Sequence, residues 1–209
     1  MSKAQAAQEQ PNPNVGRPRK PAIDVSIHDA VLATLTEYGY SGLTFDQVAK
    51  RAGVTRPTIY RRASSKVALV VGALIDKYGL DPVPDTGRVR EDLRTLQQSQ
   101  VRLYTDLAFQ EALPGVLVDI RSDADALDTW VRGFVKPRRL SVAASVERGI
   151  QRGEIAADAD VEWICEVLTG PLLSAAFLQG VSIVSETIAA ETVELVLLRF
   201  GRRKQGFEV

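Results

Sequence analysis

The feature of this sequence that most constrains its fold is the helical spacing of apolar residues along almost the whole chain. Ile27, Val31 and Leu35, for example, recur every four residues, which places their side chains on one face of an α-helix. No part of the 209-residue sequence shows the sustained alternation of apolar and polar residues that is typical of a half-buried strand. We therefore predict an all-α fold with about nine helices.

Prolines and glycines divide this pattern into a small N-terminal and a larger C-terminal domain. Residues 1–21 are polar and contain four prolines, so we expect a disordered basic arm. The segment DPVPD at residues 81–85 predicts a linker between domains at 22–80 and 86–203. The predicted helices cover residues 27–39, 44–52, 56–62, 65–78, 89–107, 113–118, 125–152, 161–179 and 189–200. The longest of them contains Pro137, which we expect to kink or break it.

Charge is unevenly distributed, although the chain as a whole is neutral. Residues 1–80 contain eleven Lys or Arg and six Asp or Glu, a net charge of +5, and the remaining residues carry −5. A basic head on an acidic body favours a polyanionic partner such as nucleic acid. Charge alone leaves open the alternative of a solvated face without a partner.

The scarcity of metal-binding and nucleophilic side chains narrows the function classes. His28 is the single histidine and Cys165 the single cysteine, which excludes an intrachain disulfide and a multi-cysteine zinc site. Asp106 and Glu111 are too isolated to suggest an acid–base pair, and we find no nucleophile with a base. We therefore predict no catalytic residue, no metal and no cofactor, with His28 an ordinary residue of the first helix and Cys165 a small hydrophobe rather than a redox sensor.

One uncharged stretch, residues 167–185, is long enough to raise the question of a membrane span. It contains Gly170 and Pro171 together with several polar side chains, and Glu162 and Glu166 lie just upstream. A helix that is apolar nearly all round is more often buried inside a protein. The N-terminus also lacks the apolar segment of a secretory signal, so we predict no membrane partner and a cytoplasmic location.

A helix-turn-helix pattern lies within the basic head. Thr44 and Gln47 have capping-box spacing at the start of a short helix, which ends at Ala52-Gly53-Val54, where the glycine permits a tight turn. The next helix presents hydroxyls and hydrogen-bond donors of the kind that suit base edges and phosphates in a DNA major groove. The residues assigned to DNA are Arg17, Arg19, Lys20, Thr44, Thr55, Arg56, Thr58, Tyr60, Arg61 and Lys66.

Several of these assignments have alternatives. Arg17, Arg19 and Lys20 lie just before the first helix, which favours an arm that reaches the minor groove; a solubilising tail is the alternative. Thr44 is first a helix cap, and its position at a helix N-terminus also suits a phosphate. Arg62 is compatible with either a DNA contact or a structural role.

Residues 24–75 closely resemble the DNA-binding domain of the tetracycline-repressor (TetR) family of transcriptional regulators. The resemblance rests on an ordered set of segments, GLTFDQVA at 42–49, AGVT at 52–55, TIYR at 58–61 and SKVAL at 65–69. It implies a three-helix DNA-binding domain followed by a helical domain for a small-molecule effector and for dimerisation. A homodimer would then bind a pseudo-palindromic operator, and because most members repress, the resemblance implies a repressor that the effector releases.

A weaker similarity covers the second domain. The segments RGEI at 152–155 and GPL at 170–172 resemble a pattern of one large branch of the family, in which the last two helices form the dimer. One departure concerns the end of the recognition helix. Ala63 stands where members usually carry Phe or Trp, and Ser64 where many have Pro. A missing ring leaves a gap unless a neighbour fills it, so we expect the pose of that helix to be affected.

The second domain is expected to hold an effector pocket and the dimer interface. Aromatic residues between its helices are candidates for the pocket, with core or dimer packing as the alternative. They are Tyr104, Phe109, Trp130 and Phe134. The last two helices are so apolar that exposing them would leave a larger patch than monomers tolerate. The predicted interface residues are Val161, Ile164, Leu168, Leu172, Ala176, Val193, Val196, Leu197 and Phe200.

Three other functions compete with a ligand-controlled regulator. A helical protein-interaction adaptor without specific DNA binding would show no steep salt dependence on duplex DNA. An enzyme on a helical scaffold would need catalytic groups that the sequence does not supply. A ligand-independent DNA binder would have a second domain filled by side chains, with no cavity.

Overall fold

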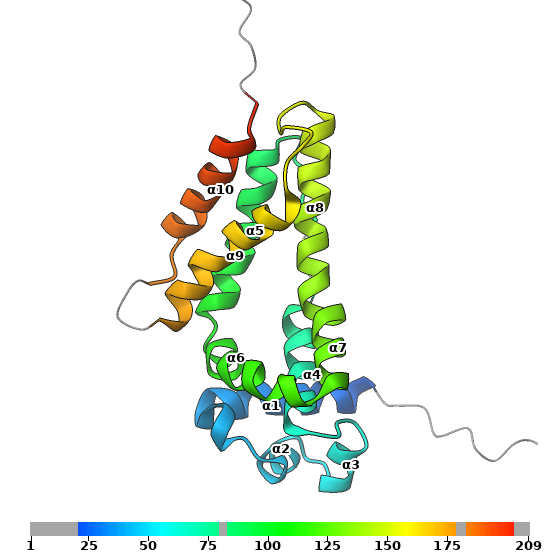
Figure 1. The fold of residues 1–209 in the computed structure, drawn as a ribbon. Helices are drawn as coiled ribbons and strands as arrows, with labels where there is room; N and C mark the ends of the chain where they lie inside the picture. The colour runs from blue at the N-terminus through cyan, green and yellow to red at the C-terminus, as the bar shows by residue number, and fades with distance from the viewer. Residues whose placement is uncertain (1–20, 80–82, 179–182, 203–209) are drawn as a thin grey trace, which may run out of the picture.

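The computed structural model describes residues 21–79, 83–178 and 183–202, and within them the chain is helical (Figure 1). Apart from one isolated bridge between Ile155 and Gly201, the described residues contain no strand. The all-α prediction is therefore confirmed. The helices are α1 (Pro21–Gly42), α2 (Phe45–Arg51), α3 (Arg56–Tyr60), α4 (Lys66–Tyr78), α5 (Val89–Thr105), α6 (Leu107–Asp119), α7 (Ala124–Trp130), α8 (Lys136–Gln151), α9 (Val161–Phe177) and α10 (Glu186–Phe200).

Local caps fix the helices of the head. The capping box at Thr44 is present: its backbone amide donates to Gln47 Oε1 at 2.9 Å, and its hydroxyl accepts from the Gln47 amide at 3.3 Å. Ser65 caps α4 in the same way through the amide of Ala68. Gly39 and Gly53 have φ of +67° and +65°, the left-handed region that glycine adopts without strain; Gly39 kinks α1 near its C-terminal end, and Gly53 lies in the turn between α2 and α3.

Besides α1, which begins at Pro21 and ends at Gly42 rather than covering residues 27–39, two predicted features of α3 differ in the structure. The third helix ends at Tyr60 rather than at residue 62. Thr55 holds the N-cap position of α3, but its hydroxyl lies 3.0 Å from the Thr58 hydroxyl and accepts no backbone amide. Because these two side chains bond to one another, the first turn of α3 is fixed by a side-chain pair instead of a cap.

The predicted start of the sixth helix is wrong. The sequence predicted a helix from residue 113 because Pro114 suits a first turn, but α6 begins at Leu107 and contains Pro114 in its interior. Its start is fixed by the Asp106 carboxylate, which accepts from the amides of Ala108 and Phe109 at 3.0 and 3.4 Å. A strong N-cap thus overrode the proline as the signal for the helix start.

The expected interruption near Pro137 takes the form of a π turn. Residues Val131–Val135 adopt π geometry between α7 and α8, and Pro137 lies in the first turn of α8. Proline lacks the amide that would continue a regular α-helical ladder, so a wider turn just before it is expected. The π turn joins α7 and α8 into one continuous rod, which gives nine helical rods among the described residues, as predicted.

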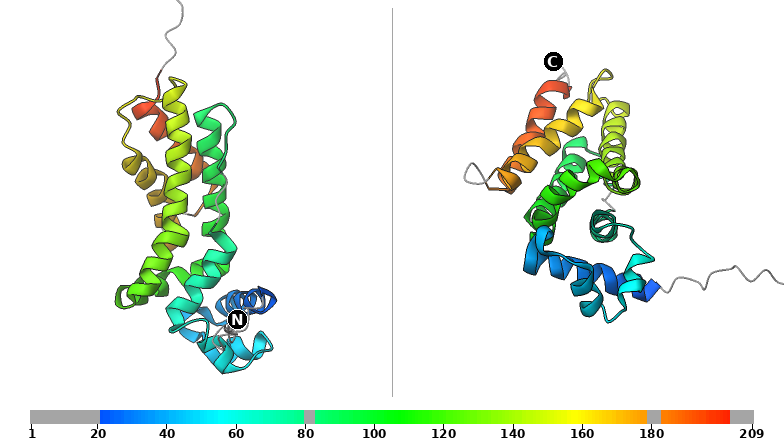
Figure 2. Two further views of the ribbon diagram at one scale, coloured as in Figure 1. Left: turned by 90° about the vertical axis from the view of Figure 1, so that its right-hand side faces the viewer. Right: turned by 60° about the horizontal axis from the view of Figure 1, so that its bottom comes forward.

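The buried side chains form two hydrophobic cores, and Figure 2 shows the helices that surround them. The lower core joins the head to the near part of the body, and it includes Leu35 of α1, Leu74 of α4 and Phe109 of α6. The upper core is formed by α5, α8, α9 and α10, around buried residues such as Leu93 and Leu168. The head therefore shares one core with α6 and α7 of the body. A displacement of α6 or α7 would alter the packing of α1 and α4.

Polar contacts also join the head to the body. Tyr40 at the end of α1 donates its hydroxyl to Asp119 Oδ2 of α6 at 2.8 Å. The Ser65 hydroxyl donates to Asp123 Oδ2 at 2.6 Å, beside the 3₁₀ turn Ile120–Ser122. Among the described residues, no helix is both long enough and apolar enough to cross a membrane.

Candidate functional site

The surface of α3 is the first candidate site, and it lies at the end of the molecule that is far from α10 (Figure 1). Ile59 is fully buried and anchors α3 to the head. Arg56, Tyr60 and Arg61 are exposed, and Tyr60 packs edge-on against Phe45 of α2 with ring centroids 4.7 Å apart. The helix therefore presents polar side chains outward from a firmly anchored base.

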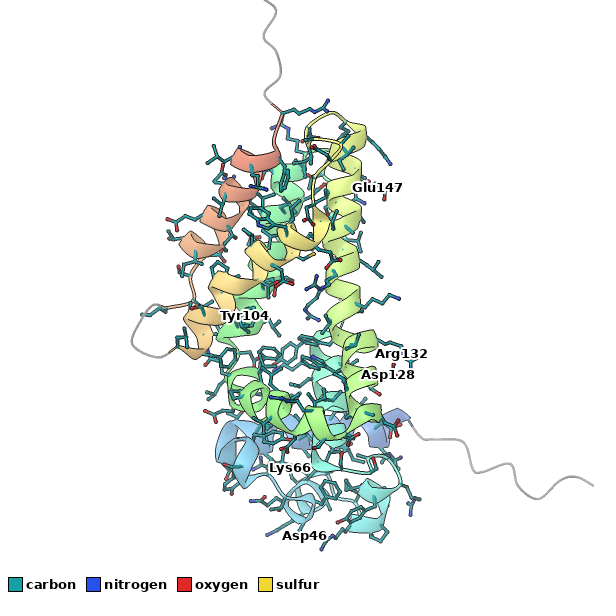
Figure 3. The ribbon with its side chains drawn as sticks, in the orientation of Figure 1. Asp46, Lys66, Tyr104, Asp128, Arg132 and Glu147 are labelled. Atoms are coloured by element: carbon teal, nitrogen blue, oxygen red, sulfur yellow. The ribbon has the colours of Figure 1, made fainter. Side chains whose placement is uncertain are left out.

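Hydrogen bonds within α3 hold these side chains in place. Arg61 donates to the Thr58 hydroxyl at 3.0 Å, and Arg56 donates to the Tyr60 hydroxyl at 3.0 Å. Arg56 also pairs with Asp46 of α2 at 3.1 Å, and the bond to Tyr60 together with the Asp46 charge raises the pKa of its guanidinium. Asp46 lies at the tip of the head (Figure 3). These exposed donors match the kind of surface that the sequence predicted for DNA.

Two further predicted residues are placed with partners inside the head. The Thr44 hydroxyl is exposed at the N-terminus of α2 and belongs to its capping box. Lys66 is half-buried; its ammonium donates to the Tyr40 carbonyl at 2.8 Å and lies 4.4 Å from the centre of the Tyr40 ring. A phosphate contact by Lys66 thus remains a prediction, made by a group that already has a structural partner. Arg17, Arg19 and Lys20 lie outside the described residues.

Arg62, which the sequence left open, has a structural role. Its guanidinium pairs with Asp24 of α1 and donates to the Thr58 carbonyl at 3.2 Å, so it ties α3 to α1. Next to it, the gap expected at Ala63 is present. A hollow of about 240 Å³ lies between α1 and α4, bounded by Ala63, His28 and Gly72 among others.

The second candidate site is a cavity of about 190 Å³ in the body. All four aromatic residues predicted for a pocket line it. Trp130 and Phe134 stack with centroids 4.0 Å apart, and Phe109 lies 5.7 Å from both Phe134 and Tyr104. Tyr104 lies in the middle of the molecule, above α6 in the view of Figure 3. The side chains of the body thus leave a cavity. A ligand-independent DNA binder would instead have a body that is filled by side chains.

Other residues of the cavity were missed by the sequence analysis. They include Gln100 of α5, Arg138 and Arg139 of α8, and Glu166 and Thr169 of α9. For Gln100 a signal existed: it follows Leu93 and Gln97 at helical spacing and precedes Tyr104 by four residues, so it lies on the buried face of α5.

Charged groups border the cavity on the side of α8 and α9. Arg139 forms ion pairs with both Glu162 and Glu166. The Arg138 guanidinium lies 3.7 Å from the centre of the Phe134 ring and donates to the carbonyl of Tyr78. Burial raises the pKa of the Cys165 thiol to about 11, so this cysteine stays protonated and behaves as a small hydrophobe.

The predicted dimer interface needs correction. Five of its nine residues are buried within the protomer, where they pack in the chain's own cores and cannot face a second copy: Ile164, Leu168, Leu172, Val193 and Val196. Val161, Ala176, Leu197 and Phe200 are half-buried. Helical periodicity identified an apolar face correctly, but that face packs on α5 and α8. The exposed apolar residues of α10 are Leu195 and Leu198, which border a groove of about 740 Å³.

Other titratable residues have structural partners. His28 Nδ1 lies 3.1 Å from Asp76 Oδ2 on α4. Asp106 pairs with Lys77 at 2.8 Å besides capping α6. Within the described residues no group of three or more His, Cys, Asp or Glu is placed to hold a metal ion.

Comparison with known proteins identifies the family. The model described as "Bacterial regulatory proteins, tetR family" matches residues 27–73, and "Tetracyclin repressor-like, C-terminal domain" matches residues 83–196. The chain belongs to the TetR family of transcriptional regulators. This family consists of helix-turn-helix regulators rather than enzymes.

Relatives span most of this TetR-family chain. The HTH-type transcriptional regulator YdeS of Bacillus subtilis is 30% identical over 172 residues, which cover 79% of this chain and 83% of that protein. The DNA-binding transcriptional repressor TetR of Mycobacteroides abscessus is 29% identical over 177 residues, covering 82% and 92%. The fold is similar to that of Bacillus subtilis FadR in complex with stearoyl-CoA, with a TM-score of 0.62 at 19% identity, covering 82% of this chain and 96% of that one.

Proposed function

We propose that this TetR-family regulator is a homodimeric repressor that binds a pseudo-palindromic DNA operator and is released by a small molecule bound in the body cavity. The observation that carries the proposal is the outer face of α3. There Arg56 donates to the Tyr60 hydroxyl and Arg61 donates to the Thr58 hydroxyl, and the buried side chain of Ile59 anchors the helix to the head. Preordered donors of this type suit guanine edges and phosphates. The repressor role is supported by the name of the Mycobacteroides abscessus relative.

Homodimerisation is supported by the exposed face of α10. Leu198 is 83% and Leu195 49% exposed, so two leucines about one turn apart present apolar surface to water on the same helix. A second copy packed against them would remove this apolar surface from water. Two heads held at a fixed separation would then enter successive major grooves on one face of the DNA.

A physical route connects the cavity to the head. Trp130 and Phe134 both line the cavity. Trp130 immediately precedes the π turn Val131–Val135, and Phe134 belongs to it. Gly133 of this turn packs against Ile75 of α4, so close that a Cβ on Gly133 would lie 2.7 Å from Ile75 Cδ1. A guest that displaces the two rings would therefore move α4 and, through the lower core, the head. A small difference in ligand affinity between two conformers, about 1–3 kcal/mol, suffices for such coupling.

The test is a selection of genomic DNA fragments by the purified full-length protein. We expect enrichment of one pseudo-palindromic site. Arg61→Ala should weaken binding to it at least about tenfold, whereas Arg132→Ala, an exposed arginine of the π turn paired with Asp128, should not. Binding without sequence preference would favour the alternative function, a protein-interaction adaptor.

The same protein tests the dimer. Leu195→Glu combined with Leu198→Glu should give monomers by sedimentation and reduce operator affinity. Leu140→Glu, which changes an exposed leucine of α8, serves as the control. Dimers that survive the double change would place the interface on another surface.

A further inference from the structure

We propose that the body cavity binds an uncharged, flat aromatic molecule of one or two fused rings that carries a hydrogen-bonding group. The role of this molecule as the effector rests on the proposed function, but its binding does not. Four features of the cavity lead to this class of ligand: its volume, its walls, the engaged charges at its border and two polar groups that have no partner among the described residues.

The volume limits the size of the guest. At about 190 Å³ the cavity is somewhat larger than an engineered apolar cavity of about 150 Å³ that binds benzene. One ring or two fused rings are therefore of a size that this volume can hold. Stearoyl-CoA, the ligand named for the Bacillus subtilis neighbour, is far larger than this space.

The walls favour a planar aromatic guest. Trp130 and Phe134 are nearly parallel, with an interplanar angle of 13°, and Phe109 is stacked on Phe134 at 16°. Tyr104 meets Phe109 edge-on. Aromatic pairs prefer offset-stacked or edge-to-face geometry, and this cluster offers both to a guest ring.

The charged side chains at the border of the cavity are already engaged by the protein, which argues against a charged guest. Arg138, Arg139 and Glu166 line the cavity; Arg139 pairs with Glu166 and Glu162, and Arg138 donates to the carbonyls of Phe134 and Tyr78. An ionised guest would have to leave water and displace one of these contacts to gain a counter-charge. An uncharged guest avoids this cost.

Two polar groups are available for a hydrogen bond to the guest. Within the described residues, neither the Gln100 amide nor the Thr169 hydroxyl, both of which line the cavity, has a hydrogen-bond partner in the protein. Gln97, one turn earlier on α5, is different: its amide donates to the Leu168 carbonyl at 3.0 Å and to the Thr192 hydroxyl at 2.5 Å. Gln97 thus joins helices, while Gln100 is free to bind a ligand.

The experiment is calorimetric titration of the full-length protein with three probes of similar size: naphthol, naphthoate and naphthylmethylammonium. We expect naphthol to bind at least about tenfold more tightly than either charged probe. A charged probe that binds as tightly as naphthol, or the failure of all three to bind, would overturn the proposal.

Amino-acid substitutions test whether naphthol binds in the body cavity. Leu117→Trp should abolish naphthol binding, because Leu117 lines the cavity and is 47% exposed, so the larger side chain is tolerated. Val118→Trp, at the exposed neighbour, is the control.

A second pair of variants tests the hydrogen bond to the guest. Gln100→Leu should weaken naphthol binding about fivefold but should not weaken the binding of methylnaphthalene, which lacks a polar group. Gln98→Leu, at an exposed position, should change the binding of neither compound. Unchanged naphthol binding in Leu117→Trp would contradict the assignment to this cavity.

The outcome is separable from that of the proposed function. If naphthol binds as expected but leaves the operator complex intact, the ligand class stands and the effector role fails. If the protein binds no operator, the regulatory proposal fails, while calorimetry still decides the ligand class.

Discussion

The molecule contains two hollows of similar volume with different walls. The hollow in the head, about 240 Å³, lies where Ala63 leaves space and is bordered by His28 and by the ion pair of Arg62 with Asp24. The cavity in the body, about 190 Å³, is lined in part by stacked aromatic rings. These rings pack on one another at the wall of the cavity, whereas the hollow in the head lies beside one small side chain.

This contrast indicates two different consequences for function. In the body, the empty space is supported by side chains that a guest can contact, so it suits a ligand. In the head, the empty space lies at the end of α3 and leaves that helix with less packing than a ring at Ala63 would provide. Under the proposed function, the first space would hold the effector, and the second would reduce the packing at the C-terminal end of the helix that is proposed to meet DNA.

The largest expected effect comes from enlarging the body cavity. Trp130→Ala should lower the free energy of unfolding by about 3–5 kcal/mol, because it removes a buried ring that stacks on Phe134. Leu127→Ala, on the exposed side of α7, should cost much less. Denaturant unfolding of both variants measures the difference, and equal losses would mean that the ring cluster does not support the cavity.

Filling the hollow in the head should have the opposite sign. Ala63→Phe should raise the free energy of unfolding by about 1 kcal/mol, since the ring occupies existing space and contacts α1 and α4. Ser64→Phe places the same ring on an exposed neighbour and should not stabilise the protein. Thermal unfolding compares them; a destabilised Ala63→Phe would show that the hollow cannot accept a ring.

The proposed mechanical link between the body cavity and the head can be tested at Gly133. In Gly133→Ala the new methyl group meets the Ile75 side chain, so that this side chain or α4 itself must move, and operator affinity should fall about tenfold while the residues proposed to contact DNA are unchanged. Gly170→Ala is the matched control, because a Cβ there has open space and an alanine in a helix is favourable. If Gly133→Ala binds operator like wild type, the π turn does not carry the coupling.

The smallest effect concerns pH at the contact of α4 with α6. Burial by itself would raise the pKa of the Asp106 carboxyl, but the interactions with Lys77, the nearby Tyr78 hydroxyl and the Phe109 amide outweigh it and hold this pKa below its ordinary value. A lowered pKa in the folded state means stability that is present at neutral pH and lost as the carboxyl is protonated, below about pH 4.

Asp106→Asn keeps a capping side chain but removes the charge. Its melting temperature should lie slightly below that of wild type at neutral pH, and this gap should close below about pH 4. A gap that is independent of pH would assign the effect to the cap alone.

Sequence reasoning succeeded where the determining interactions are local. The caps at Thr44 and Ser65 and the turn at Gly53 depend on residues a few positions apart, so the head could be predicted closely. The family pattern also located the gap at Ala63. The start of α6 was missed because Pro114 was given more weight than the Asp106 cap, although both signals were present in the sequence.

Features that depend on tertiary packing were harder to predict. Periodicity shows that Leu168 and Val196 lie on buried faces, but it does not say whether the chain itself or a second copy covers them. Gln100 could be placed on the buried face of α5, yet the absence of a partner for its amide depends on the positions of α6, α8 and α9. The aromatic residues of the cavity could be predicted because large apolar rings on packed helices lie between the helices.

The measurement that tests the account most directly is the binding of the selected DNA fragment across a salt series, with the protein-to-DNA ratio determined by sedimentation. The account predicts two chains for each site and an affinity that falls on the order of a thousandfold between about 50 and about 200 mM salt. One chain for each site with a shallow dependence on salt would contradict it.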